Sequence, residues 1–154
     1  MQEKDSTPGF PNNLLSSFPV VITKAVEWGE QDSFGHVNNT VYLKWCEAAR
    51  VDYLCRIGMW KLIAEEQKGP ILAAQSCDYR RPVDYPDTIH VGARITRIGN
   101  SSFVMEHIIV SEERHMVVAE SDSTLVFYDY AESHPLPIPG YLREAICEME
   151  GKKL

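Results

Sequence analysis

The feature that most constrains this chain is a helical pattern from about residue 39 to residue 59, apolar on nearly all sides. Only a few charged residues interrupt it, and two of them, Glu47 and Arg50, have the i,i+3 spacing of an ordinary helical ion pair. A helix that is apolar on most sides is buried rather than laid on a surface. Asn38 directly precedes the pattern, and its short side chain suits the N-cap position. We therefore predict one long helix that the rest of the chain has to cover.

Most of the remaining sequence has the pattern of β-strands. Segments rich in β-branched or alternating apolar residues predict strands over 19–28, 70–79, 88–98, 101–111 and 116–130. The last three are joined by short polar turns, which indicates an antiparallel meander. A short closing helix is predicted from Leu142, Ala145, Ile146 and Met149, which recur at helical spacing.

This order of elements limits the architecture, because a single sheet must cover its apolar face and only one long helix is available. The predicted fold class is α+β, with a curved antiparallel sheet of five or six strands wrapped around one long central helix. Residues 1–18 are predicted to be a flexible N-terminal arm, and residues 19–150 to be the single domain. Free sheet edges are often paired with a second copy of a chain, so we predict a homodimer and leave open a dimer of dimers.

Composition excludes several classes of function. The 154 residues contain 15 Lys and Arg against 22 Asp and Glu, a formal charge of −7, with no basic stripe for nucleic acid. No apolar run is long enough to span a membrane, and because the N-terminal residues have mixed charge and no apolar stretch, we expect no secretory signal. The four cysteines form no Cys-x-x-Cys pair and no cluster with histidines, so we predict no metal site and a reducing, cytoplasmic location.

The segment leading into the long helix carries the candidate chemistry: Asp32, Gly35, His36, Asn38 and Asn39. Free backbone amides at a helix N-terminus stabilise developing negative charge. A carboxylate beside them can act as a nucleophile or as a general base on water. Each of these residue types is common in turns and caps, but together they supply an attacking group and an oxyanion site, which are the two requirements of acyl transfer.

The stretch from Gly29 to Asn39, continuing through Tyr42 to Arg50, resembles the signature of hot-dog-fold acyl-CoA thioesterases of the 4-hydroxybenzoyl-CoA thioesterase type. Its His-Val-Asn-Asn portion is also similar to plant acyl-ACP thioesterases. The link at 77–87 resembles the family's Y-x-x-P-x-x-x-x-D segment, and 123–129 resembles its final long strand. The resemblance covers about residues 19–150 and implies a hot-dog thioesterase domain there.

The resemblance also implies roles for single residues. Asp32 matches the family's catalytic carboxylate, and Asn39 matches the position whose backbone amide polarises the thioester carbonyl. His36 matches a histidine implicated in catalysis in the acyl-ACP branch, although Phe34 departs from the asparagine of that branch. Gly35 and Asn38 are assigned to substrate binding in the same loop.

The predicted function is therefore hydrolysis of an acyl-CoA thioester to the free acid and CoA, with no cofactor and no metal. Arg80 and Arg81 are the candidates for binding the CoA phosphates, with Arg94 or Arg97 as further possibilities. The net charge argues mildly against an acidic carrier protein as the thiol carrier. Two alternatives stay open, a non-catalytic acyl-CoA-binding hot-dog protein and a hot-dog hydratase or dehydratase.

Overall fold

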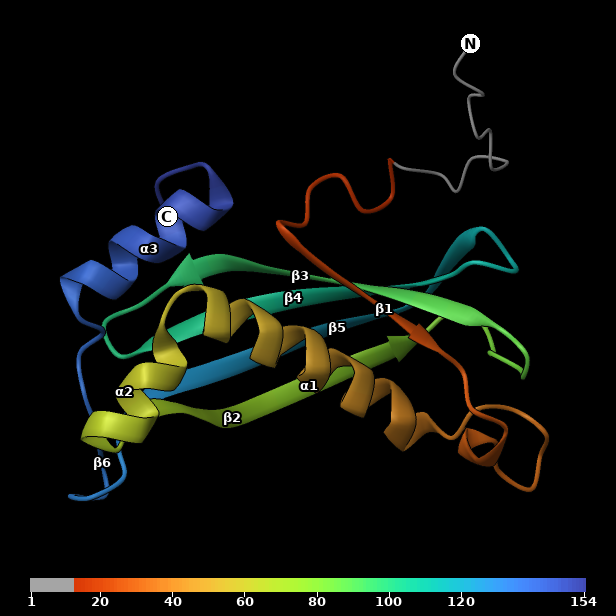
Figure 1. Ribbon diagram of the computed structural model, residues 1–154, viewed down its shortest axis with the longest axis horizontal. Helices are drawn as coiled ribbons and strands as arrows, with labels where there is room; N and C mark the ends of the chain where they lie inside the picture. Colours follow the sequence, from red (N-terminus) through yellow and green to blue (C-terminus); the bar gives the residue numbers. More distant parts are fainter. Residues whose placement is uncertain (1–12) are drawn as a thin grey trace, which may run out of the picture.

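The computed structural model describes residues 13–154, which form one antiparallel sheet and three α-helices (Figure 1). The elements in chain order are β1 (Val20–Ala25), the 3-10 helix η1 (Trp28–Glu30), α1 (Asn39–Arg56), α2 (Met59–Glu66), β2 (Lys68–Tyr79), β3 (Thr88–Ile98), β4 (Ser102–Ser111), β5 (Met116–Asp129), β6 (His134–Pro135) and α3 (Gly140–Glu150). The strand order is β1-β3-β4-β5-β2, with β6 paired to β5. The predicted α+β class and the β3-β4-β5 meander are confirmed.

The long helix begins where the sequence predicts, because Asn38 is its N-cap and the Asn38 side chain accepts a hydrogen bond from the Thr40 N–H at 2.9 Å. Its predicted end at residue 59 is wrong. The helix stops at Arg56, and Gly58 takes a left-handed conformation with φ 82° that redirects the chain into α2. The predicted first strand is also too long, since β1 ends at Ala25.

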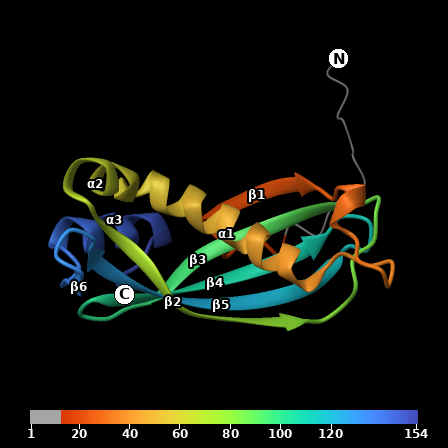
Figure 2. The ribbon, with the colours of Figure 1, turned by 90° about the horizontal axis from the view of Figure 1, so that it is seen from below.

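The core lies between α1 and one face of the sheet. Helix α1 packs over β1, β3 and β4, and Figure 2 shows it lying along the sheet's curved face. The alternation predicted for β3 is confirmed, because the side chains that face the helix are fully buried: Ile89, Val91, Ala93 and Ile95. The large aromatic residues Trp45, Tyr53 and Phe103 also fill this core, whereas Trp60 on α2 is 58% exposed.

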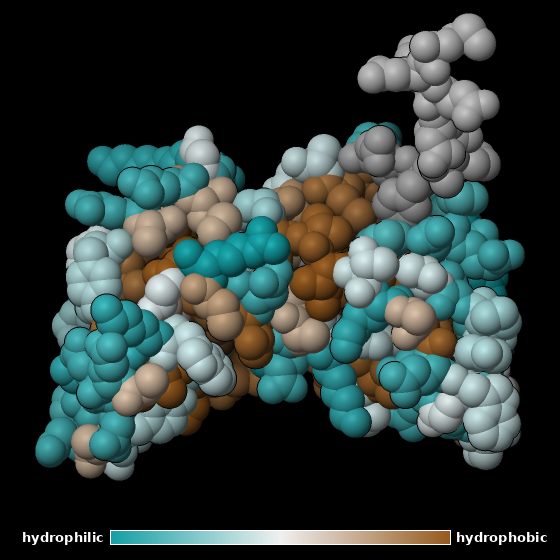
Figure 3. Space-filling view, in the orientation of Figure 1, coloured by the Kyte–Doolittle hydropathy of each residue, from teal (hydrophilic) through white to brown (hydrophobic). Residues whose placement is uncertain are grey.

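The two edge strands of the sheet differ in how far other elements shield them from solvent. Edge strand β1 lies beside α1, whereas edge strand β2 has twelve residues and remains open to solvent along most of its length. Ile71 and Leu72 of β2 are 39% and 43% exposed, and Val51 on α1 is 39% exposed. Figure 3 shows apolar surface among polar groups on the face that carries α1.

Most of the predicted N-terminal arm, residues 1–12, lies outside the described residues, so the boundary at residue 18 stays a prediction. The Phe18 ring packs on the outer face of β3 at Gly92, where a Cβ atom would come within 2.7 Å of the ring. The Arg94 guanidinium lies 4.6 Å from the centre of the same ring. Between residues 13 and 154, no helix is both long and apolar enough to span a membrane.

Candidate active site at the N-terminus of the central helix

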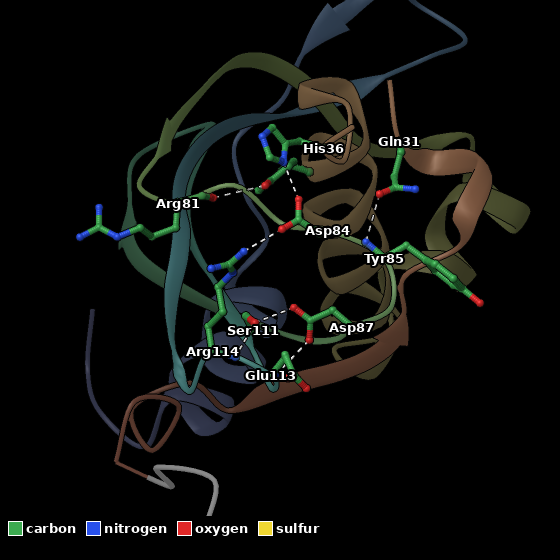
Figure 4. A network of polar contacts seen from close by, with 10 residues as sticks. Gln31, His36, Arg81, Asp84, Tyr85, Asp87, Ser111, Glu113 and Arg114 are labelled. Atoms are coloured by element: carbon green, nitrogen blue, oxygen red, sulfur yellow. Dashed lines mark hydrogen bonds and ion pairs between the residues drawn. The ribbon is translucent and has the colours of Figure 1, made fainter. Parts of the chain in front are cut away.

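Two segments far apart in sequence lie side by side at the N-terminal end of α1 (Figure 4). The first is the loop that precedes the helix, and the second is the link between β2 and β3. The Val37 N–H donates to the Val83 carbonyl at 2.8 Å, and the Tyr85 N–H donates to Gln31 Oε1 at 3.2 Å. Backbone and side-chain hydrogen bonds therefore fix the loop against the link.

A tight turn from Asp32 to His36 sets the direction of the candidate catalytic carboxylate. The Asp32 N–H donates to the His36 carbonyl at 2.8 Å, and the Asp32 carboxylate accepts the Phe34 N–H at 2.8 Å. Gly35 has φ +80°, a left-handed conformation that residues with a Cβ seldom adopt. The predicted role of Gly35 in substrate binding is untested, and its observed contribution is to the shape of this turn.

A shallow pocket of about 320 Å³ gathers most of the predicted site. Its lining residues are Asp32, His36, Val37, Asn39, Tyr42, Tyr79, Arg80, Arg81 and Pro82. The carboxylate, the imidazole, the first residue of α1 and both candidate phosphate-binding arginines thus share one opening. Gly35 and Asn38 are not among the lining residues.

The backbone amide of Asn39 suits an oxyanion donor. The Asn38 side chain accepts the Thr40 N–H, and in the described part of the chain the Asn39 N–H has no hydrogen-bond acceptor. Asn39 begins an 18-residue helix, whose aligned peptide dipoles give its N-terminus a partial positive charge. A free donor at such a position favours a developing negative charge in the pocket.

His36 has a partner that the sequence did not reveal. Its Nδ1 is hydrogen-bonded to the carboxylate of Asp84 in the β2–β3 link, and Asp84 also accepts from Arg114 Nη2 at 2.8 Å. Asp84 was overlooked because it is 48 residues from His36 in sequence and no motif connects the two.

Two tyrosines complete the pocket wall. The rings of Tyr42 and Tyr79 meet edge to face with centres 5.1 Å apart, and the Tyr79 hydroxyl donates to the Asn39 carbonyl at 3.0 Å. Burial raises the pKa of Tyr42 to about 12 and also raises the pKa of Tyr79. Both phenols are therefore neutral near pH 7. The only sequence signal for them was their position in the two family motifs.

Arg80 and Arg81 differ in whether their guanidinium groups are already paired with a carboxylate. Arg80 forms an ion pair with Glu120 at 2.8 Å, whereas among the described residues the Arg81 side chain donates only to the Arg80 carbonyl, at 2.7 Å. In Figure 4 the Arg81 guanidinium points away from the pair formed by His36 and Asp84. Arg94 does not line this pocket, and its guanidinium is paired with Glu106.

A second polar cluster lies inside the core, beneath α1. His107 of β4 is 2% exposed, and within the described residues neither of its ring nitrogens has a hydrogen-bond partner. Burial, followed by the nearby Arg50 charge, lowers the pKa of His107 to about 4. Arg50 is buried, with its Nη1 3.5 Å from Ser123 Oγ, and within residues 13–154 it makes no direct ion pair with Glu47. Burial lowers the pKa of Arg50, and the charge of Glu47 opposes that shift.

The chain matches the family model described as "Thioesterase-like superfamily" over residues 26–146. It is 27% identical over 118 residues to the long-chain acyl-CoA thioesterase FadM of Escherichia coli, covering 77% of this chain and 89% of FadM. It is 26% identical over 130 residues to the chloroplastic acyl-acyl carrier protein thioesterase ATL3 of Arabidopsis thaliana, covering 84% of this chain and 67% of ATL3.

The fold is also similar to a solved thioesterase from Thermus thermophilus in complex with coenzyme A and Zn. The TM-score is 0.80, and the sequence identity is 33% over 90% of this chain and 98% of that one. The match to the family model spans most of the chain, and it agrees with the loop, helix and curved sheet described above. The chain therefore belongs to the thioesterase-like superfamily of hot-dog-fold thioester hydrolases.

Proposed function

We propose that this protein hydrolyses acyl-CoA thioesters to a free acid and CoA at the pocket formed by Asp32 and Asn39. The observation that carries the proposal is that Asp32 and Asn39 line one pocket, and that within residues 13–154 the Asn39 N–H at the N-terminus of α1 has no acceptor. A thioester needs both an attacking group and a donor for its carbonyl oxygen. The coenzyme A complex of the Thermus thermophilus thioesterase supports CoA as the thiol carrier.

The reaction begins when the thioester carbonyl oxygen accepts the Asn39 N–H. In the general-base route, Asp32 removes a proton from water while the water oxygen attacks the carbonyl carbon. In the nucleophilic route, the Asp32 carboxylate oxygen attacks, and water then cleaves the resulting anhydride. In both routes the carbon–sulfur bond breaks and the CoA thiolate leaves. Because a thiolate is a good leaving group, this site needs no separate general acid.

The two routes are distinguished by oxygen isotope labelling. A single turnover in ¹⁸O-enriched water places the label only in the acid product by the general-base route. In the nucleophilic route, water that attacks the acyl carbon of the anhydride also labels only the product on the first turnover. Water that attacks the Asp32 carboxyl carbon instead labels the enzyme. Mass spectrometry of the peptide containing Asp32, together with trapping of the anhydride by hydroxylamine, separates these cases.

We also infer that the protein acts as a homodimer joined along β2. The outer side of β2 has no neighbouring strand in the described sheet, and this long edge presents unpaired backbone groups. Exposed Ile71 and Leu72 add apolar area that a second copy would bury. Light scattering at micromolar concentration should give a mass of twice 17.5 kDa or a multiple of it. A strictly monomeric mass would contradict this inference.

The function is tested with a panel of short-chain, long-chain and aromatic acyl-CoAs, including enoyl-CoAs. Free CoA, detected with a thiol reagent, identifies a thioesterase. Loss of the enoyl absorbance without CoA release identifies a hydratase, and binding without either change identifies a non-catalytic acyl-CoA-binding protein. Absence of CoA release from every member of the panel would contradict the proposed function.

A further inference from the structure

Three separate parts of the chain meet beside the pocket in a line of charged groups. His36 comes from the loop before α1, Asp84 from the β2–β3 link, and Arg114 from the turn between β4 and β5. Figure 4 shows the Asp84 carboxylate between the imidazole and the guanidinium. The Asp84 carboxylate bonds to both neighbours, with one oxygen on His36 Nδ1 and the other on Arg114 Nη2.

This arrangement determines which nitrogen of His36 is available for chemistry. An ionised carboxylate accepts hydrogen bonds and has no hydrogen to donate. The hydrogen in the contact with Asp84 is therefore assigned to Nδ1. The remaining ring nitrogen, Nε2, points away from Asp84 in Figure 4, and His36 is one of the residues that line the pocket with Asp32. The hydrogen-bond partner of one ring nitrogen thereby determines which of the two nitrogens is left to face the pocket.

We propose that Asp84 is a positioning residue that fixes His36 with Nδ1–H engaged and Nε2 directed to the reaction. This inference rests on the proposed thioesterase function. In this role Nε2 accepts a hydrogen bond from the water that enters the reaction and so orients that water, while Asp32 supplies the base or the nucleophile. Arg114 holds the second oxygen of Asp84 and limits its rotation.

Exposure of the pair argues against a role in stability alone. The side chains of His36 and Asp84 are 52% and 41% exposed, and that of Arg114 is 38% exposed. Ion pairs this accessible to water add little to folding stability. Loss of Asp84 should therefore leave the fold intact, so that a change in turnover reports on the orientation of His36.

The competing explanation is that Asp84 and Arg114 only tie the link to the turn between β4 and β5. In that case, removing either residue would have the same effect, whether or not His36 is present. If Asp84 acts through His36, the effect of removing it disappears once His36 has been replaced. A double-mutant cycle separates the two explanations.

The kinetic test uses His36→Gln, Asp84→Ala, the double variant and Arg114→Gln, with the best substrate of the acyl-CoA panel. We expect Asp84→Ala to lower kcat roughly tenfold with KM within about twofold, and the double variant to match His36→Gln. Asp84→Asn retains an acceptor oxygen and should restore most of kcat. Independent, multiplicative losses in the double variant, or an unchanged kcat in Asp84→Ala, would overturn the proposal.

A second measurement does not depend on activity. Long-range ¹H–¹⁵N correlation spectra of the histidine rings should show His36 hydrogenated at Nδ1, with the signal identified by its absence in His36→Gln. The Nδ1–H signal should shift or broaden in Asp84→Ala and persist in Arg114→Gln. An unchanged His36 signal in Asp84→Ala would reject the positioning role. Failure of the wild-type protein to release CoA would instead reject the thioesterase function, so the two failures are distinct.

Discussion

Two histidines of this protein occupy opposite environments. His36 lies at the mouth of the pocket with half of its side chain exposed, and its ring is bonded to Asp84. His107 is buried in the sheet beneath α1, and neither of its nitrogens has a partner in the described part of the protein. The first ring is half exposed and oriented by Asp84, whereas the second is almost fully buried.

The contrast between the exposed His36 and the buried His107 predicts which substitutions change turnover and which change folding stability. A side chain at an open site is held by a few exposed contacts, so its replacement changes turnover more than folding. A polar side chain in the core carries the cost of lost hydration, so its replacement changes folding more than turnover. The loop before α1 should therefore respond to substitution in kinetics, and the cluster around His107 should respond in stability.

The largest expected effect is on turnover, at the open site. Asp32→Asn removes the base or nucleophile and should lower kcat by about 10² to 10⁴-fold, while the folded structure and substrate affinity are retained. Initial rates of CoA release and thermal unfolding measure the two properties. Asp52→Asn is the matched control, because Asp52 is a surface carboxylate on α1 that pairs with Arg56. Undiminished turnover in Asp32→Asn would reject the mechanism.

The next effect is the response of folding stability to acid at the buried site. The pKa of His107 falls from its ordinary 6.5 to about 4 in the folded protein, so the unfolded chain takes up a proton first as the pH falls. Its contribution to stability is complete above pH 6.5 and is lost progressively down to about pH 4. The loss amounts to about 3 kcal/mol.

Denaturant unfolding at pH 7, 6, 5 and 4 measures this loss, and the difference between wild type and His107→Leu isolates it from the titration of carboxylates. The nearby Arg50 is common to both proteins, so its effect cancels in the difference. An equally steep pH dependence in His107→Leu would show that His107 is not its source.

A smaller effect is expected at neutral pH. His107→Leu removes two unsatisfied nitrogens and should raise the free energy of unfolding by about 1 to 2 kcal/mol, with kcat within about twofold of wild type. His36→Leu should leave the free energy of unfolding within about 0.5 kcal/mol while lowering kcat. If His107→Leu abolished turnover instead, the separation of chemistry from stability would fail.

The smallest effect concerns the arginines of the open site. Arg81→Gln should raise KM for acyl-CoA about threefold to tenfold, and Arg80→Gln should raise it less, because Glu120 already pairs with Arg80. Neither change should alter kcat appreciably. Steady-state kinetics at low and high salt test this, since added salt weakens phosphate binding and reduces the difference between wild type and Arg81→Gln. Equal KM values for all three proteins would exclude both arginines as phosphate ligands.

Local patterns in the sequence were sufficient for most of the fold. The alternation of apolar and polar residues predicted β3, and Asn38 predicted the start of α1. Both signals depend only on residues that are neighbours in sequence. The break at Gly58 was missed, since a single glycine near the end of an apolar helical pattern does not reveal a left-handed turn. His107 did leave a signal, as it interrupts the apolar alternation of Phe103, Met105 and Ile109.

The candidate site also has a part that the sequence predicts and a part that depends on the tertiary fold. Asp32, His36 and Asn39 lie within eight residues, so one motif contains them and the structure places them around one pocket. The partnership of His36 with Asp84 depends on how the β2–β3 link folds against the loop, and Arg114 comes from a third segment. Such contacts follow from the tertiary fold, and no pattern within either segment indicates them.

The sheet topology also has a consequence for synthesis on the ribosome. Val20 in β1 pairs with Ala93 in β3, and Lys68 in β2 pairs with Asp129 in β5. The partner of each edge strand is therefore synthesised much later than the edge strand itself. Translation adds about 5 to 20 residues per second, so β1 and the apolar helix α1 are without their partners for several seconds. During that interval the nascent chain exposes Tyr42, Trp45 and Tyr53, which are buried in the core of the finished protein. We therefore expect chaperones that bind apolar nascent chains to be needed early, before the β3-β4-β5 meander is complete.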